Sequence, residues 1–523
     1  MSALPDASTR HARTVVAGPD GLADESAPPG GTPASSDPWG GRDATGLAAA
    51  LRTGELGSTE LVAAALTRIS ADGFGAFVTV TAERALAVAR DADARLVHAR
   101  RDGTVDGLPA LLGVPSAVKD LTPTAGIPTS YGSAAMTGTV PQVSAEIVER
   151  MTRAGLISLG KTNTPEFGAP CYTEPDIAPP ARTPWDPSRS AGGSSGGAAA
   201  AVSGGQLPLA HGSDGGGSLR IPASVCGLVG FKPSRGLVSS APSVSDLLGM
   251  SSHGCVSRTV RDTAAFLDAA AGPAPGDATW ASGPRAFTAA CRQDPPPLRI
   301  ARCAVPVIAP DAPIDPAVLA AYEDASRLLE RLGHELTDVD LGLPEPVLAG
   351  FPLVWGIGFA TIDLPPGTDH LLRPLTRWLR QTAGAVDAVT VARAQQATRQ
   401  AAFDLTARLH PFDAVLTPTL AQLPARVGAL RNDDDPAADF AAQTRYTPWT
   451  SLWNMTGMPA VSLPLSWTGG PDPLPVGMML AARPGADADL FALAGSLERA
   501  LPWAHRWPTS LGAATSGLTG GTS

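Results

Sequence analysis

The chain has 523 residues, of which 44% are hydrophobic and 17% are charged, and its formal net charge is -10. This composition can bury a large core, and the negative charge argues against a nucleic-acid partner. Five cysteines without a CxxC pair argue against a disulfide framework and against a metal site of the zinc type, and they favour a reduced, cytoplasmic protein. We find no apolar run of about 18 residues and no signal peptide, so we expect no membrane partner.

Composition divides the chain into one long domain and two tails. Residues 1–42 and 509–523 are rich in small and polar residues, which predicts disorder. The domain is expected over 43–508. Apolar spacing and glycine turns predict, for its first part, helices over 43–52 and 58–69, a strand over 74–80, a helix over 82–101, a strand within 111–121, and a helix, a turn and a strand within 144–163.

The second half of the domain continues the alternation of helices and strands. The predicted elements are a helix over 256–272, a strand within 292–303, a helix over 315–336, helical structure over 340–400, a strand over 412–420, an acidic loop over 431–439, strands over 459–467 and 475–482, and a helix over 486–501. This rhythm predicts an α/β fold, with a central mixed sheet covered by helices on both faces.

The most unusual stretch of the sequence covers residues 190–236. It holds two glycine-serine runs, GGSSGG over 192–197 and SDGGGS over 213–218, separated by an Ala/Val-rich stretch and a short apolar strand. A flexible linker is the simple alternative, but the apolar residues between and after the runs argue against it. Dense glycine allows close approach of the main chain, so we expect a buried site whose reactive side chains are serines.

Ser218 directly follows Gly215, Gly216 and Gly217. Free amide N–H groups beside a serine hydroxyl would combine a nucleophile with an oxyanion hole, as acyl transfer requires. The alternative is a tight glycine turn without chemistry. No histidine has an acidic partner at a useful spacing, and no GxSxG motif occurs, which argues against an α/β-hydrolase.

Lysine is the other candidate for the base that a serine nucleophile needs. The chain has three lysines, Lys119, Lys161 and Lys232, and Lys119 ends an apolar strand. Burial would lower the pKa of its amine and make the neutral form available as a general base. Taken alone, however, Lys119 could instead form an ion pair with Asp120 at a strand end.

Together, the motifs GVPSAVKD, GKTNTPEF, GGSSGGAAAAV and SDGGGSLRIPASVCGLVGFKPSRG resemble the amidase signature family, and the resemblance covers about 43–508. It implies a catalytic triad of Lys119, Ser194 after a cis peptide bond, and Ser218. It also implies that the amides of Gly215, Gly216, Gly217 and Ser218 form the oxyanion hole. Asp214 and Arg220 are then expected to hold this loop. Ser195 is the other candidate for the role of Ser194. Within the family, the motifs are most similar to the branch of 6-aminohexanoate cyclic-dimer hydrolases.

The resemblance implies an amidohydrolase that cleaves a carboxamide through an acyl-serine intermediate, without a metal or an organic cofactor. The partner is then a small-molecule amide, and a homodimer is compatible with the sequence. The alternatives are an acyltransferase on the same triad, the glutaminase subunit of a tRNA-dependent amidotransferase, and a non-catalytic binding protein. Cys171 and Tyr172 are expected near the acyl pocket. Either Trp355 and Phe359 or Trp449 and Trp453 are expected to line the outer pocket, although packing in the core or at the entrance is the favoured role of any one of these residues.

Overall fold

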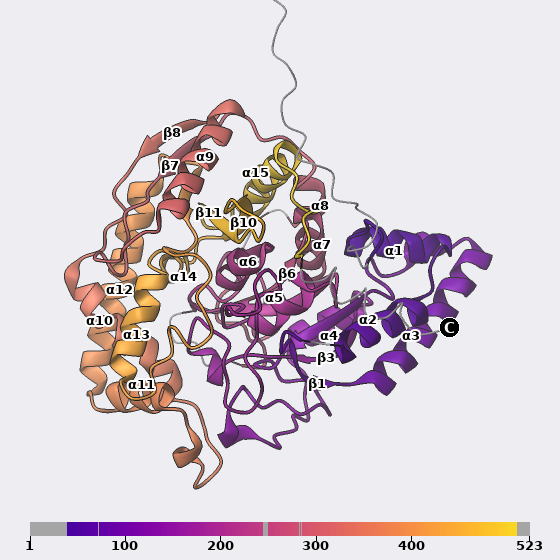
Figure 1. Cartoon of the computed structure of the whole chain (residues 1–523), viewed down its shortest axis with the longest axis horizontal. Helices are drawn as coiled ribbons and strands as arrows, with labels where there is room; N and C mark the ends of the chain where they lie inside the picture. The colour runs from indigo at the N-terminus through magenta and orange to yellow at the C-terminus, as the bar shows by residue number, and fades with distance from the viewer. Residues whose placement is uncertain (1–38, 72, 244–248, 282, 284, 510–523) are drawn as a thin grey trace, which may run out of the picture.

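The computed structural model describes residues 39–71, 73–243, 249–281, 283 and 285–509 (Figure 1). The predicted tails over 1–42 and 509–523 therefore lie outside the described residues, apart from 39–42 and 509. Within the described part of the chain, every helix is too short or too polar to cross a membrane.

A sheet of eight strands forms the centre of the molecule, in the order β4-β6-β5-β10-β11-β9-β7-β8. Neighbours from β4 to β9 run antiparallel, whereas β9, β7 and β8 run parallel, so the sheet is mixed as predicted. The strands are β4 (Leu209–Asp214), β5 (Val229–Lys232), β6 (Ser252–Ser257), β7 (Arg299–Arg302), β8 (Glu335–Asp338), β9 (Ala414–Pro418), β10 (Ala460–Trp467) and β11 (Pro475–Ala482).

Helices flank this sheet, and two groups of them lie on opposite sides of the molecule (Figure 1). The first group is α1 (Ala44–Thr53), α2 (Ser58–Ser70) and α3 (Ala82–Asp102), and the second is α10 (Glu345–Ala360), α11 (Pro374–Gly384), α12 (Ala388–Leu409) and α13 (Pro436–Tyr446). The others are α4 (Glu146–Arg153), α5 (Gly196–Ser203), α6 (Arg220–Cys226), α7 (Val260–Ala270), α8 (Phe287–Ala290), α9 (Pro316–Arg331), α14 (Leu452–Thr456) and α15 (Asp487–Ala500).

Two boundaries differ from the sequence-based expectation. The helix predicted over 256–272 begins only at Val260, because residues up to Ser257 pair with β4 and β5 as strand β6. By contrast, the strand predicted within 292–303 lies at Arg299–Arg302 as expected, after three consecutive prolines that cannot donate ladder hydrogen bonds. The acidic loop predicted over 431–439 runs into α13, whose first residue is Pro436.

A second, smaller sheet was not predicted. It has the order β1-β3-β2, with β1 (Phe77–Val80), β3 (Ile157–Thr162) and β2 (Pro115–Lys119). Its edge strand β2 lies beside the edge strand β4 of the large sheet. The Ser116 hydroxyl donates to the Leu209 carbonyl at 3.2 Å, and the Lys119 N–H donates to His211 Nδ1 at 3.3 Å. We call this contact between β2 and β4 the sheet seam.

Helix α5 begins inside the GGSSGG run and is fully buried. A Cβ atom at Gly197 would lie 2.3 Å from the main-chain nitrogen of Asn163 and 2.5 Å from the carbonyl oxygen of Ala76. These atoms belong to main chain next to β3 and β1, so they cannot move aside as a flexible side chain can. Glycine at this position therefore lets α5 pack directly against the small sheet.

Replacing Gly197 with alanine is expected to lower the free energy of unfolding by about 1–3 kcal/mol, the usual cost of overpacking a buried site. The matched control is Gly384→Ala in α11, where an added Cβ meets nothing within 4 Å. Both changes gain the same helix propensity, so the comparison isolates the clash. Thermal denaturation would check this, and equal midpoints for the two variants would contradict it.

Candidate active site

Lys119 lies at the end of β2, in the sheet seam, and is completely buried. Its amine donates to Ser194 Oγ at 2.7 Å, to Ser213 Oγ at 3.2 Å and to the Ser213 carbonyl at 3.4 Å. Burial lowers the pKa of Lys119 to about 7, although the negative charge of Asp214 opposes the shift. A substantial fraction of this amine is therefore uncharged at neutral pH.

The ion pair that we considered between Lys119 and Asp120 does not form. Asp120 Oδ1 lies 3.4 Å from the amine of Lys161, on the neighbouring strand β3, and Asp120 Oδ2 accepts from the Ser130 N–H at 2.9 Å. Successive residues of a strand point to opposite sides, so Asp120 and Lys119 face different surroundings. Among the described residues, Lys119 has hydroxyl and carbonyl partners but no carboxylate partner.

Ser194 and Ser195 follow one another but have different contacts. The Gly193–Ser194 peptide bond is cis, and the Ser194 hydroxyl faces both Lys119 and a cavity. Ser195 is fully buried. Its hydroxyl donates to the Ser213 carbonyl at 3.2 Å and its N–H donates to the Ser218 carbonyl at 3.2 Å. Ser195 therefore links the two glycine-serine runs.

The Asp214 carboxylate organises the loop that leads to Ser218. Its oxygens accept from the N–H of Gly217 at 2.8 Å and of Leu219 at 3.2 Å. The N–H of Gly217 is thus engaged by Asp214, which corrects the expectation that it belongs to the oxyanion hole. The N–H groups of Gly215, Gly216 and Ser218 donate no hydrogen bond to another described residue.

Arg220 holds Asp214 in this position, and both side chains have no exposed surface. The guanidinium donates to both carboxylate oxygens at 2.9 Å. Burial alone would raise the pKa of Asp214, but the charge of Arg220 and hydrogen bonds from Arg220 and Asn454 outweigh it and hold this pKa below the usual range. Asp214 therefore stays ionised while it binds the loop.

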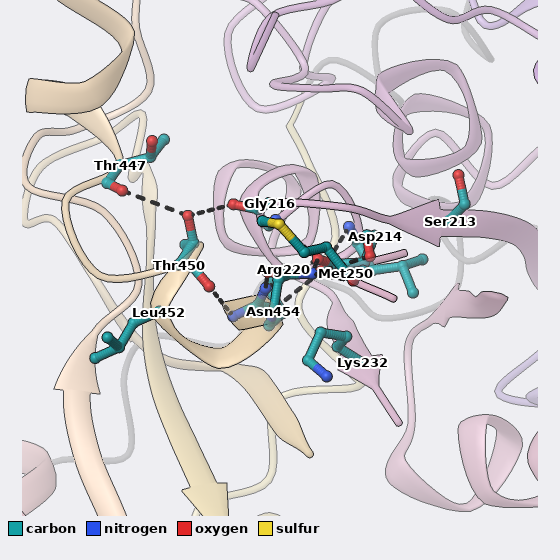
Figure 2. Close-up of polar contacts among 12 residues, drawn as sticks. Ser213, Asp214, Gly216, Arg220, Lys232, Met250, Thr447, Thr450, Leu452 and Asn454 are labelled. Carbon is teal, nitrogen blue, oxygen red and sulfur yellow. Dashed lines mark hydrogen bonds and ion pairs between the residues drawn. The ribbon is translucent and has the colours of Figure 1, made fainter. Parts of the chain in front are cut away.

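Two residues that the sequence analysis missed complete this network (Figure 2). The Asn454 amide donates to the Asp214 carboxylate at 2.9 Å, and its oxygen accepts from Arg220 at 2.7 Å. The Thr450 hydroxyl donates to the Gly216 carbonyl at 2.7 Å, which fixes the orientation of that peptide. Both lie in the segment PWTSLWNMTG, where polar residues interspersed among apolar ones were the available signal.

Ser194 and Ser218 open into one cavity of about 680 Å³. Helix α10 supplies much of its wall, including Trp355 and Phe359. Asp363 is the one acidic or basic side chain among the described residues that line this cavity, apart from His253. The cavity is therefore suited to an uncharged, largely apolar ligand.

A second cavity of about 50 Å³ also reaches Ser218. Cys171, Gly216 and Trp355 are among its lining residues. The Trp355 ring packs against Gly216, because a Cβ there would lie 3.0 Å from the ring. Trp355 thus borders both cavities, which we call the main and the small cavity.

The other three aromatic residues expected near the substrate line neither cavity. Tyr172 is buried and its hydroxyl donates to Asp439 at 2.7 Å. Trp449 is buried and its indole N–H donates to the Val305 carbonyl at 2.8 Å, while Trp453 has no exposed surface. These rings fill the core, so the structure favours the core-packing alternative for them.

The chain is similar to proteins of a known class. The 6-aminohexanoate-cyclic-dimer hydrolase of Paenarthrobacter ureafaciens is 32% identical over 507 residues, covering 91% of this chain and 97% of the relative. A solved structure of 6-aminohexanoate cyclic dimer hydrolase complexed with substrate has a TM-score of 0.80 at 30% identity, covering 90% and 99% of the two chains. A bacterial aryl acylamidase structure has a TM-score of 0.78 at 26% identity, covering 91% and 98%.

Fold and similarity together define an enzyme that hydrolyses amide bonds. The family model described as Amidase matches residues 60–491, and the chain belongs to the amidase family. The matched region contains both glycine-serine runs and the sheet seam.

Replacing Asp214 with asparagine is expected to lower the free energy of unfolding by about 3–5 kcal/mol, because Arg220 would keep a buried charge without its counter-charge. The matched control is Asp324→Asn, which breaks an exposed pair with Arg327 and should cost about 1 kcal/mol or less. Denaturation of both variants, followed by circular dichroism, measures the difference. Similar losses in the two variants would show that the buried pair does not hold the loop.

Proposed function

We propose that this amidase uses Lys119 as the general base, Ser194 as the proton relay and Ser218 as the nucleophile. One observation carries the proposal: the buried Lys119 amine lies 2.7 Å from Ser194 Oγ, and Ser194 and Ser218 face the same cavity. We assign this activity to one domain over 43–508 that acts in the cytoplasm. All five cysteines are buried and unpaired, which supports a reducing compartment.

The surroundings of the amine suit a base. A neutral amine has two N–H bonds and one lone pair. The hydroxyl and carbonyl oxygens of Ser213 take the two hydrogens, which directs the lone pair at Ser194 Oγ. In this state the hydrogen bond between Lys119 and Ser194 runs from the hydroxyl to the amine. Ser194 can then give its proton to Lys119 as it takes the proton of Ser218.

Deprotonated Ser218 attacks the carbonyl carbon of the substrate. The N–H groups of Gly215, Gly216 and Ser218 stabilise the negative oxygen that forms, and one such donor contributes about 3 kcal/mol in the transition state. The Lys119 ammonium then returns its proton through Ser194 to the leaving nitrogen. The C–N bond breaks, an acyl-Ser218 ester remains, and water activated by the same relay releases the acid.

The cavities indicate the substrate class. We propose an uncharged carboxamide with its larger apolar or aromatic part in the main cavity and a small substituent in the small cavity. The names of two similar proteins, a cyclic-dimer hydrolase and an aryl acylamidase, fit this class. An acyltransferase that uses the same residues can be distinguished from a hydrolase by adding an amine. In an acyltransferase the added amine would outcompete water for the acyl-enzyme.

Ser218→Ala is expected to lower kcat for amide hydrolysis by about four orders of magnitude or more, because it removes the nucleophile. The melting temperature should stay close to that of the unchanged enzyme. When the unchanged enzyme is exposed to a fluorophosphonate, mass spectrometry should place the adduct on Ser218. Ser195→Ala serves as the control and should keep measurable turnover. An adduct on another serine would overturn the assignment.

The rate of amide hydrolysis is expected to depend on pH through Lys119. Its pKa is lowered to about 7, and only the neutral amine accepts a proton, so kcat/KM should rise as pH increases through about 7 and then level off. Each unit below this pKa should cost about tenfold in rate. A profile of kcat/KM between acid and alkaline pH measures this. A flat profile across neutral pH would exclude Lys119 as the base.

A further inference from the structure

Two histidines outside the proposed triad form a connected pair beside it. His211 on β4 and His253 on β6 lie on the same face of the large sheet, with ring centroids 5.3 Å apart. Their nitrogens His211 Nε2 and His253 Nδ1 are 3.1 Å apart. His211 is fully buried, whereas His253 lines the main cavity.

The main chain of the sheet seam fixes the protonation of His211. The N–H of Lys119 can only donate, and it points to His211 Nδ1 at 3.3 Å. His211 Nδ1 must therefore be the unprotonated, accepting nitrogen of a neutral ring. The proton of His211 is then on Nε2, which faces His253.

The same reasoning extends to His253. Because His211 Nε2 carries a hydrogen, His253 Nδ1 has to accept it. A neutral His253 then carries its own hydrogen on Nε2, at the end of the ring away from His211. Protonation of either ring would bring two N–H groups face to face.

The charges around the pair agree with two neutral rings. Burial, His253 and the two lysines Lys119 and Lys161 lower the pKa of His211 well below its usual value. Burial and Lys119 lower the pKa of His253 to about 4. The pair thus offers a hydrogen-bond donor without a positive charge at neutral pH.

The ladder of the large sheet places this donor beside the proton relay. His253 is directly opposite Ser213, and Ser213 Oγ accepts from the Lys119 amine at 3.2 Å. In the proposed mechanism, Lys119 and Ser194 return a proton to the leaving nitrogen. His253 and Ser194 line the same cavity, so a substrate whose leaving nitrogen faces Ser194 would extend its amine portion along the wall that holds His253.

We propose that His253 is a specificity-determining residue whose Nε2–H donates to a hydrogen-bond acceptor in the amine portion of the substrate, and that His211 positions it. This rests on the proposed function of Lys119, Ser194 and Ser218. Amides whose amine portion carries an ether or carbonyl oxygen close to the amide nitrogen are favoured over hydrocarbon analogues. An ammonium group at that position is rejected, because it has no lone pair to accept with.

The first experiment tests the donor without turnover. Nitrogen-15 labelling of the histidines in the Ser218→Ala enzyme, followed by long-range proton–nitrogen correlation at pH 7.5, about half a unit above the pKa of Lys119, reports the tautomer of each ring. Neutral rings with Nε2–H are expected for both, with assignment by His211→Gln and His253→Gln. A neutral Nδ1–H tautomer or a charged ring for His253 would overturn the proposal.

The same sample distinguishes two probe ligands of equal shape. The methoxyethyl amide and the butyl amide of one arylacetic acid differ by an oxygen in place of a methylene. The first should shift the His253 Nε2 resonance more than the second. Equal shifts from both amides would contradict the donor role, whether or not Ser218 is the nucleophile.

The third test measures the kinetics of enzyme in which Lys119, Ser194 and Ser218 are unchanged. The ratio of kcat/KM for the methoxyethyl over the butyl amide is expected to be about three- to tenfold, the effect of one neutral hydrogen bond. His253→Gln places its amide nitrogen near the Nε2 position and should keep part of this ratio. His253→Asn places it near Nδ1, so the ratio should fall to about one.

The control variant is His370→Gln, because His370 is an exposed residue of the 3-10 helix Asp369–Leu371. It should leave the ratio as it is in the parent enzyme. A ratio that His253→Asn leaves intact, or that His370→Gln abolishes equally, would overturn the proposal. The two proposals can fail separately. If Ser218→Ala loses all hydrolysis but the parent enzyme has a kcat/KM ratio near one for the methoxyethyl over the butyl amide, the specificity role of His253 is refuted and the role of Ser218 is not.

Discussion

The burial of one amine without a carboxylate partner is the constraint on which the proposed active site depends. Removing Lys119 from water favours its neutral form, and a directly paired acid would reverse that effect. Asp214, whose charge acts on Lys119, is bound instead by Arg220 and by main-chain N–H groups of the serine loop. The buried ion pair between Asp214 and Arg220 thereby orders the loop. Because Arg220 compensates the charge of Asp214, that charge does not restore the ammonium form of Lys119.

Two sheets contribute different parts of the site. The small sheet supplies Lys119, and the large sheet supplies Ser213 and the strand that leads to Ser218. Side chains rather than ladder hydrogen bonds join β2 to β4, so polar groups of both strands remain available at the seam. One of these groups, the N–H of Lys119 on β2, donates to His211 of the histidine pair.

Local sequence patterns were enough to predict a sheet covered by helices and to single out the glycine-rich stretch and Lys119, whereas the role of Lys119 as a base came from the family resemblance. Glycine density and lysine scarcity are properties of short windows. The contacts of Thr450 and Asn454 were not predicted, because they lie more than 230 positions from the loop that they hold. For Trp449 and Trp453 the sequence left core packing and a place near the substrate both open, because aromatic character indicates burial without saying whether a ring faces the core or a cavity.

The order of the strands has a consequence for the newly made chain. Strands β10 and β11 come from near the end of the sequence, yet they lie in the middle of the large sheet, between β5 and β9. Asn454 and Thr450, which hold the loop that leads to Ser218, also come late. An incomplete chain on the ribosome can hold Lys119, Ser194 and Ser218 but not their final arrangement. The loop that leads to Ser218 therefore reaches the braced form described above only once Thr450, Asn454 and the two central strands are present.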